Sequence, residues 1–173
     1  MRTILRSMII GFMPVIVLLF TLTASAQFSQ GRLQATGLTC ALCSKSIHQA
    51  LTKLPFIDSV QPELKTSSFE LRFNAQQPVS IPAIRAAVED AGFFIGGLIL
   101  NLSHPLSDQE RRSKQFSFGP DVFQLLDEPK GGESLQVIGK GFLSEKDFKR
   151  MSVRYAKEIK SSGAHILLIL VKY

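Results

Sequence analysis

The sequence of 173 residues contains two cysteines, and their spacing offers the clearest chemistry in the chain. Cys40 and Cys43 stand three positions apart, at the expected junction between a strand and a helix. Thiols with this spacing can bring both sulfurs onto one ion, and a helix N-terminus stabilises thiolate charge. Two thiolates suit a soft cation, first of all Cu(I) and then Hg(II) or Ag(I). Because only two sulfurs are present, Zn(II) would need ligands of other kinds.

The other residues that could do chemistry are scattered. His48 lies off the apolar face of the expected helix, while His104 and His165 have no neighbour at a metal-ligand spacing. Met151 is the only methionine beyond the N-terminal segment, and it falls in an expected core stripe. The sequence shows no pairing of nucleophile and base and no phosphate-binding glycine loop, so we do not expect an enzyme.

Strand and helix patterns alternate along the segment that must position the thiols. Helical spacing of Leu42, Ile47 and Leu51 predicts an amphipathic helix that ends at Pro55. A second helix is capped by Ser80 and ends at Gly92. The expected strands are 31–38, 57–62, 67–74 and 93–102. The predicted order is βαββαβ, an α+β arrangement.

The residues around the thiols match a known sequence pattern. Gly37-Leu38-Thr39-Cys40-Ala41-Leu42-Cys43 is close to Gly-Met-Thr-Cys-x-x-Cys, and apolar Ile47 and Leu51 follow at the matching positions. Residues 88–93 also fit the end of that pattern's second helix. Residues 31–100 therefore resemble the heavy-metal-associated domain of copper chaperones, copper-transporting P-type ATPases and periplasmic mercury-binding proteins. The resemblance implies a ferredoxin-like fold that binds a soft metal through Cys40 and Cys43.

The resemblance also implies four neighbours of the ion, namely Leu38, Thr39, Lys45 and Phe93. Leu38 stands where the family usually has methionine, and it can fill the same volume beneath the loop. Phe93 stands where some members have tyrosine, so a hydroxyl is missing there. Lys45 could offset the negative charge of a metal dithiolate, or it could simply be an exposed lysine on the helix.

The chain continues well beyond the region of resemblance. Residues 103–118 are polar and are interpreted as a linker that can hold one helical turn after Ser107. Residues 119–173 are interpreted as a small α+β unit of unrecognised fold. In that unit we expect strands at 121–127, 134–143 and 166–171. A helix begins at Ser144, with a capping box to Asp147 and a stripe formed by Phe148, Met151, Tyr155 and Ile159. About 55 residues are marginal for independent stability, so this unit should pack on the first domain or on a partner.

The N-terminus has the features of an export signal. Arg2 and Arg6 precede an apolar run and the small residues Ala24 to Ala26, which predicts cleavage after Ala26 and a bacterial periplasmic location. The alternative is a retained membrane anchor, although the run is shorter than the roughly 20 residues of a spanning helix. Cleavage would reduce the net charge of +6 to +4, with 18 basic and 14 acidic residues, and no basic block suggests nucleic-acid binding.

These features favour an exported protein that buffers Cu(I) or passes it to a transporter or another metal-binding domain. Mercury scavenging is an alternative that uses the same dithiol. A thiol–disulfide redox protein is another, because an oxidising compartment can join the two sulfurs. In a fourth hypothesis, residues 119–173 are an adaptor that captures a partner. Two chains could also share one ion through four thiolates and form a metal-bridged dimer.

Overall fold

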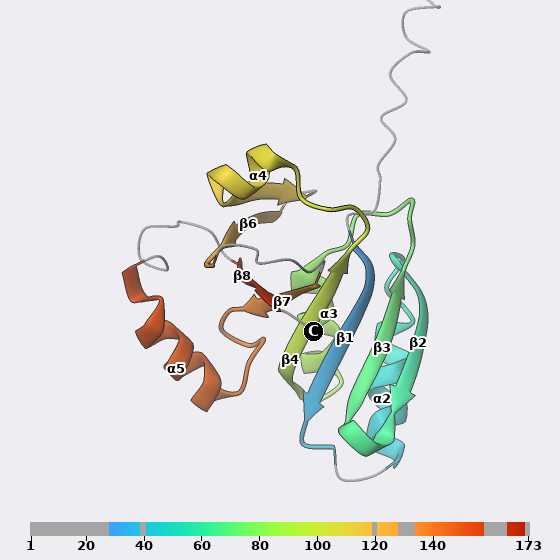
Figure 1. Cartoon of the computed structure of the whole chain (residues 1–173). Helices are drawn as coiled ribbons and strands as arrows, with labels where there is room; N and C mark the ends of the chain where they lie inside the picture. Colours follow the sequence, from blue (N-terminus) through green and yellow to red (C-terminus); the bar gives the residue numbers. More distant parts are fainter. Residues whose placement is uncertain (1–27, 39–40, 119–120, 128–133, 158–165, 172–173) are drawn as a thin grey trace, which may run out of the picture.

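A computed structural model of the whole chain describes residues 28–38, 41–118, 121–127, 134–157 and 166–171 (Figure 1). Within these ranges, no helix combines the length and apolar character needed to cross a membrane. The predicted export signal and its cleavage site fall in residues 1–27, outside the described part.

The first half of the chain folds as predicted from the strand and helix patterns. Its elements are β1 (Phe28–Thr36), α2 (Ala41–Leu51), β2 (Ile57–Glu63), the 3-10 turn η1 (Leu64–Thr66), β3 (Ser68–Phe73), α3 (Ile81–Asp90) and β4 (Phe94–Leu102). The strands lie in the order β2-β3-β1-β4, and all neighbours are antiparallel. This βαββαβ order and strand arrangement define a ferredoxin-like fold, which confirms the predicted fold class.

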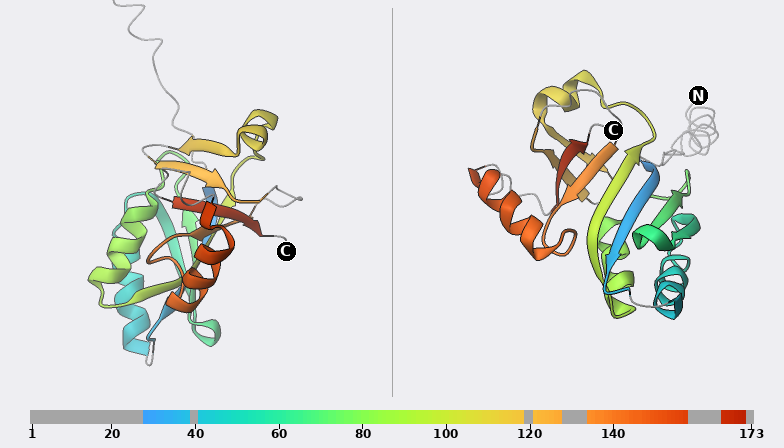
Figure 2. Two further views of the ribbon diagram at one scale, coloured as in Figure 1. Left: turned by 90° about the vertical axis from the view of Figure 1, so that its left-hand side faces the viewer. Right: turned by 60° about the horizontal axis from the view of Figure 1, so that its bottom comes forward.

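One face of this sheet is covered and the other is open. Along β3, the apolar residues Phe69, Leu71 and Phe73 are buried, while Glu70 and Arg72 between them point to the other face. The helices α2 and α3 pack against the apolar face (Figure 2). The alternation of apolar and polar residues along the strand therefore determines which face of the sheet the helices cover.

Helix α2 buries a different stripe from the predicted one. Its buried residues are Ser44, Ile47 and Leu51, whereas the side chain of Leu42 is 74% exposed. The placement of Leu42 on the apolar face was therefore wrong. Leu42 precedes Ile47 by five positions and Leu51 by nine, which places its side chain on roughly the opposite side of the helix from these two residues. A small serine takes the inward position that begins the i, i+3, i+7 stripe.

Helix α3 has the two ends that the sequence predicts. The hydroxyl of Ser80 accepts a hydrogen bond from the backbone N–H of Ala83 at 3.3 Å, and Pro82 lies in the first turn. Gly92 follows the helix with a φ of +87°, a backbone conformation that L side chains rarely adopt. The glycine lets the chain turn sharply from α3 into β4.

Replacing Gly92 with alanine should lower the free energy of unfolding by about 1 kcal/mol. A Cβ built there would meet nothing within 4 Å, so the whole effect comes from the positive φ. Chemical denaturation of both proteins measures the difference. Gly97→Ala is the matched control, because its Cβ would make only ordinary contacts with Gln34 at 3.7 Å and 3.9 Å. Equal stability of Gly92→Ala and the parent would contradict the role given to this turn.

The second half of the chain continues the same sheet. Its elements are α4 (Asp108–Ser113), β5 (Gln115–Phe118), β6 (Asp121–Leu125), β7 (Ser134–Ile138), α5 (Glu145–Arg154) and β8 (Ile166–Val171). The full order is β2-β3-β1-β4-β7-β8-β6-β5, because β7 pairs antiparallel with β4. The expected packing of this unit on the first domain therefore takes the form of strand pairing.

The segment expected to be a linker contains the helical turn expected after Ser107 and also a strand that was not expected. Ser107 and Glu110 form a capping box that starts α4, and residues 115–118 form the edge strand β5. Phe116 is buried, and its ring stacks on that of Phe123 with centroids 5.4 Å apart. The ring of Phe28, at the start of β1, meets the Phe123 ring edge to face, with centroids 6.0 Å apart. These aromatic contacts join the two halves into one core.

The strand predicted at 134–143 is shorter in the structure. It ends at Ile138 because Gly139 starts a turn, in which its carbonyl accepts a hydrogen bond from the N–H of Phe142 and Gly141 has a φ of +87°. Ser144 then caps α5 as predicted, accepting a hydrogen bond from the N–H of Asp147. The predicted stripe of α5 packs in a second, small cluster made of Leu126, Ile138, Leu143, Phe148, Met151 and Tyr155. Ile159, the last residue of that stripe, lies outside the described residues.

Candidate metal site

The segment expected to bind metal connects β1 to α2. Strand β1 ends at Thr36, and Gly37 follows with a φ of +83°, which turns the chain away from the sheet. Leu38 is half-buried and packs against the main core. Cys43 lies in the first turn of α2, and its side chain is half-buried. Thr39 and Cys40 fall outside the described residues, so the placement of Cys40 as a ligand stays a prediction.

Of the other predicted neighbours, Phe93 lies next in the chain to a residue that pairs with the end of β1. Thr36 pairs with Phe94 across β1 and β4, and the Thr36 hydroxyl donates to the Phe94 carbonyl oxygen at 3.2 Å. Phe93, which precedes that pair, is half-buried and packs against the core as Leu38 does. Lys45 is exposed on α2, so any effect of its charge on the ion would be weakened by solvent.

The two described histidines, His48 and His104, and the methionine Met151 do not add to this site. His104 is exposed in the segment after β4, and His48 is half-buried on α2, one and a half turns from Cys43. Met151 packs in the small cluster beneath α5. His165 lies outside the described residues. Among the residues that are described, no three histidine, cysteine or acidic side chains come close enough to hold a metal ion together.

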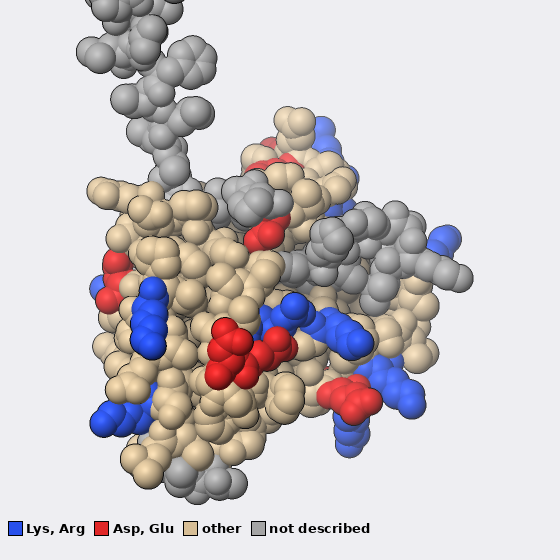
Figure 3. Space-filling model, turned by 180° about the vertical axis from the view of Figure 1, so that it is seen from behind, with Lys and Arg blue, Asp and Glu red and all other residues tan. Residues whose placement is uncertain are grey.

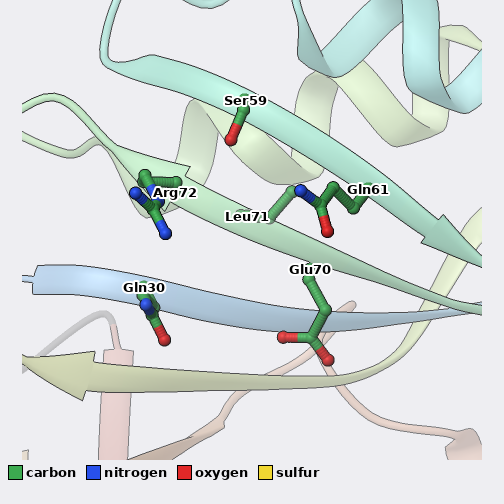
Figure 4. Close-up of a pocket in the computed structure, with 6 residues that line it drawn as sticks. All are labelled: Gln30, Ser59, Gln61, Glu70, Leu71 and Arg72. Atoms are coloured by element: carbon green, nitrogen blue, oxygen red, sulfur yellow. The ribbon is translucent and has the colours of Figure 1, made fainter.

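The open face of the sheet has a shallow hollow of a different kind. It has a volume of about 200 Å³ and is lined mainly by polar side chains, with Gln30, Glu70 and Arg72 among them (Figure 4). Glu70 is also paired with Arg32 on the neighbouring strand. Amide, carboxylate and guanidinium groups are not ligands for a soft cation, so this face offers no competing site for one.

Sequence reasoning missed the apolar surface around the loop. Leu42, Leu64 and Phe94 are 74%, 63% and 68% exposed. They lie at one end of the domain, on the first turn of α2, on η1 and at the start of β4 (Figure 1). A signal existed in the adjacent pair Phe93 and Phe94, because consecutive residues entering a strand point to opposite faces and only one of them can pack inward.

The comparisons with known proteins agree with this arrangement. Residues 32–94 match the family model for the heavy-metal-associated domain. A probable copper-exporting P-type ATPase of Archaeoglobus fulgidus is 33% identical over 60 residues, which is 35% of this chain and 7% of the ATPase. The chain thus matches only a small part of that relative's length.

Solved structures are also similar to part of this chain. The CopZ metallochaperone is 22% identical with a TM-score of 0.36, and the match covers 39% of this chain and 98% of that protein. A putative copper-ion-binding protein from Bacillus anthracis is 25% identical with a TM-score of 0.36, covering 39% of this chain and 94% of that one.

The fold and the site together define a class of domain. A βαββαβ unit places the loop between its first strand and first helix at one end, and that loop carries the dithiol sequence. Residues 32–94 are a heavy-metal-associated domain.

Proposed function

We propose that this protein is exported, binds one Cu(I) ion through Cys40 and Cys43, and buffers the ion or passes it to another protein. The observation that carries the proposal is the heavy-metal-associated domain at residues 32–94, with its dithiol sequence at the loop between β1 and α2. The copper proteins found in the comparisons support copper as the cargo. The domain acts by binding and release and performs no catalysis.

The transfer step follows from the number of ligands. Two thiolates leave the Cu(I) ion open to a third sulfur, so a partner thiolate can bond to the ion before one of the original Cu–S bonds breaks. The second bond is exchanged in the same way, and the copper stays in its +1 state throughout. The partner is another metal-binding protein, such as the metal-binding part of a transporter.

Export would expose the cysteines to oxidation, which competes with metal binding. In an oxidising compartment, the two thiols could form a disulfide and act in thiol–disulfide exchange instead. Mercury scavenging would use the same two thiolates and differs only in the ion. Residues 119–173 could serve either activity by holding a partner.

Anaerobic titration of the reduced chain, residues 27–173, with Cu(I) against a chromophoric competitor tests the proposal. We expect one tightly bound ion per chain. A parallel competition experiment with Hg(II) compares the affinities of the chain for the two ions. Redox titration of the thiols against glutathione measures their tendency to form a disulfide. Failure to compete for Cu(I) in the reduced state would contradict the proposal and favour the redox hypothesis.

A further inference from the structure

An apolar pocket adjoins the dithiol loop on the side where the second half of the chain packs. It has a volume of about 580 Å³. Thr36 and Phe94 from the heavy-metal-associated domain line one side, and Leu143, Glu145 and Phe148 line the other. The pocket therefore exists only because the C-terminal segment lies beside the metal-binding end of the domain.

One residue that lines the pocket directly precedes the dithiol loop in the sequence. Thr36 is the last residue of β1, and the next residue, Gly37, begins the dithiol segment. Phe94 is fixed beside Thr36 by strand pairing and by the hydrogen bond from the threonine hydroxyl to its carbonyl oxygen. A protein that covers the loop from this side would meet the exposed ring of Phe94 first.

Contacts with α3 hold the C-terminal wall of the pocket in place. Arg85 donates a hydrogen bond to the carbonyl oxygen of Lys140 at 3.1 Å, and its guanidinium lies 5.6 Å from the centroid of the Phe142 ring. A cation over an aromatic face stabilises this arrangement. The turn before α5 is thereby tied to the first domain, and the pocket is preformed.

We propose that this pocket receives an apolar side chain of the protein that exchanges metal with the dithiol loop. This inference rests on the proposed function, because thiolate exchange requires both proteins to place sulfur on the same ion. A specific interface buries about 800 Å² on each partner, which is more than a loop of a few residues offers. The contact must spread to the surroundings of the loop, where Leu42, Leu64 and Phe94 are exposed.

Apolar contact explains the docking better than charge does. The two charged residues that line the pocket, Lys140 and Glu145, are of opposite sign, so the pocket itself favours no partner by charge. On the face that carries α2 and α3, basic and acidic side chains likewise lie next to one another (Figure 3). Interfaces commonly gain most of their affinity from a few apolar or aromatic anchors inserted in pockets. The partner is therefore a metal-binding protein with an exposed apolar side chain next to its own metal-binding thiols.

Two substitutions probe the two walls separately. Phe94→Ser removes an exposed ring and should cost little stability, while Glu145→Trp places a large ring at the opposite wall and fills the pocket. With Cu(I)-loaded CopZ metallochaperone as the donor, both variants of the 27–173 chain should accept the ion about tenfold more slowly than the parent. The control Val153→Ser removes an apolar residue that is 77% exposed on α5 and does not line the pocket. It should accept the ion at the parent rate.

The same variants are then loaded from the Cu(I)–glutathione complex, which is too small to need the pocket. We expect equal rates and equal equilibrium affinities for Cu(I) in all of them. Parent-like transfer from the metallochaperone in both Phe94→Ser and Glu145→Trp would overturn the inference. Slow loading from glutathione would also overturn it, because the substitutions would then act on the loop itself. Failure of the parent chain to bind Cu(I) would instead refute the proposed function.

Discussion

Cys40→Ser/Cys43→Ser should bind Cu(I) at least about 1,000-fold more weakly than the parent, a loss of about 4 kcal/mol. Serine keeps nearly the size of cysteine but offers a neutral hydroxyl, which is a poor ligand for a soft cation. No other pair of sulfurs is present, because Met151 is the only further sulfur-bearing residue in the chain from residue 27 onward. Competition with a chromophoric chelator under anaerobic conditions measures the difference.

The fold of this variant should stay intact, so the loss can be assigned to the thiolates. Cys43 is half-buried at the first turn of α2, where serine is well tolerated. Ser46→Ala, which lies on the same helix and removes a hydroxyl that bonds only to the Leu42 carbonyl, is the control and should retain the parent affinity. Tight binding of one Cu(I) ion by the double variant would exclude the dithiol as the site.

Leu135→Ala should lower the free energy of unfolding by about 3 kcal/mol, although it lies outside the heavy-metal-associated domain. Leu135 has no exposed surface and belongs to the main core. It pairs with Leu100 across β7 and β4, so the cavity left by the substitution opens between the two halves of the chain. In a chain of this size, the melting temperature should fall by roughly 10 °C.

Thermal unfolding followed by circular dichroism measures this effect and also tests whether the halves unfold together. We expect a single transition in both proteins, because one core spans the β4–β7 junction. Gln136→Ala is the matched control, since Gln136 is the next residue of β7 and its half-exposed side chain points to the opposite face. A loss of stability confined to a separate, second transition would show that the C-terminal half is an independent domain.

The sequence predicts the first domain well because its signals are local. In β3, alternation of Phe69, Leu71 and Phe73 with polar residues defines both the strand and its buried face. In α3, Ser80 and Gly92 mark the two ends through the capping hydroxyl and the positive φ. The dithiol loop is also a local pattern, so the candidate ligands could be named without any knowledge of the fold.

The features that escaped prediction depend on contacts between distant segments. Polar residues 103–118 suggest a linker, yet Phe116 is buried because β5 joins β6 and its ring reaches Phe123. The pocket beside the loop joins residues about 50 positions apart, such as Phe94 and Glu145. No local pattern reports such a pairing.

The strand order also has a consequence for how the chain can fold during synthesis. Strand β8 is synthesised after the other seven strands of the sheet, yet it lies between β7 and β6 inside it. Until residues 166–171 emerge, β6 and β5 have no strand that links them to β7, whereas β1 to β4 can already form their complete antiparallel set. The metal-binding half should therefore become structured first, and the final strand then closes the sheet. A premature stop or a proteolytic cut before Ile166 would leave a gap in the middle of the sheet and expose the backbone of β7 to pairing with other chains.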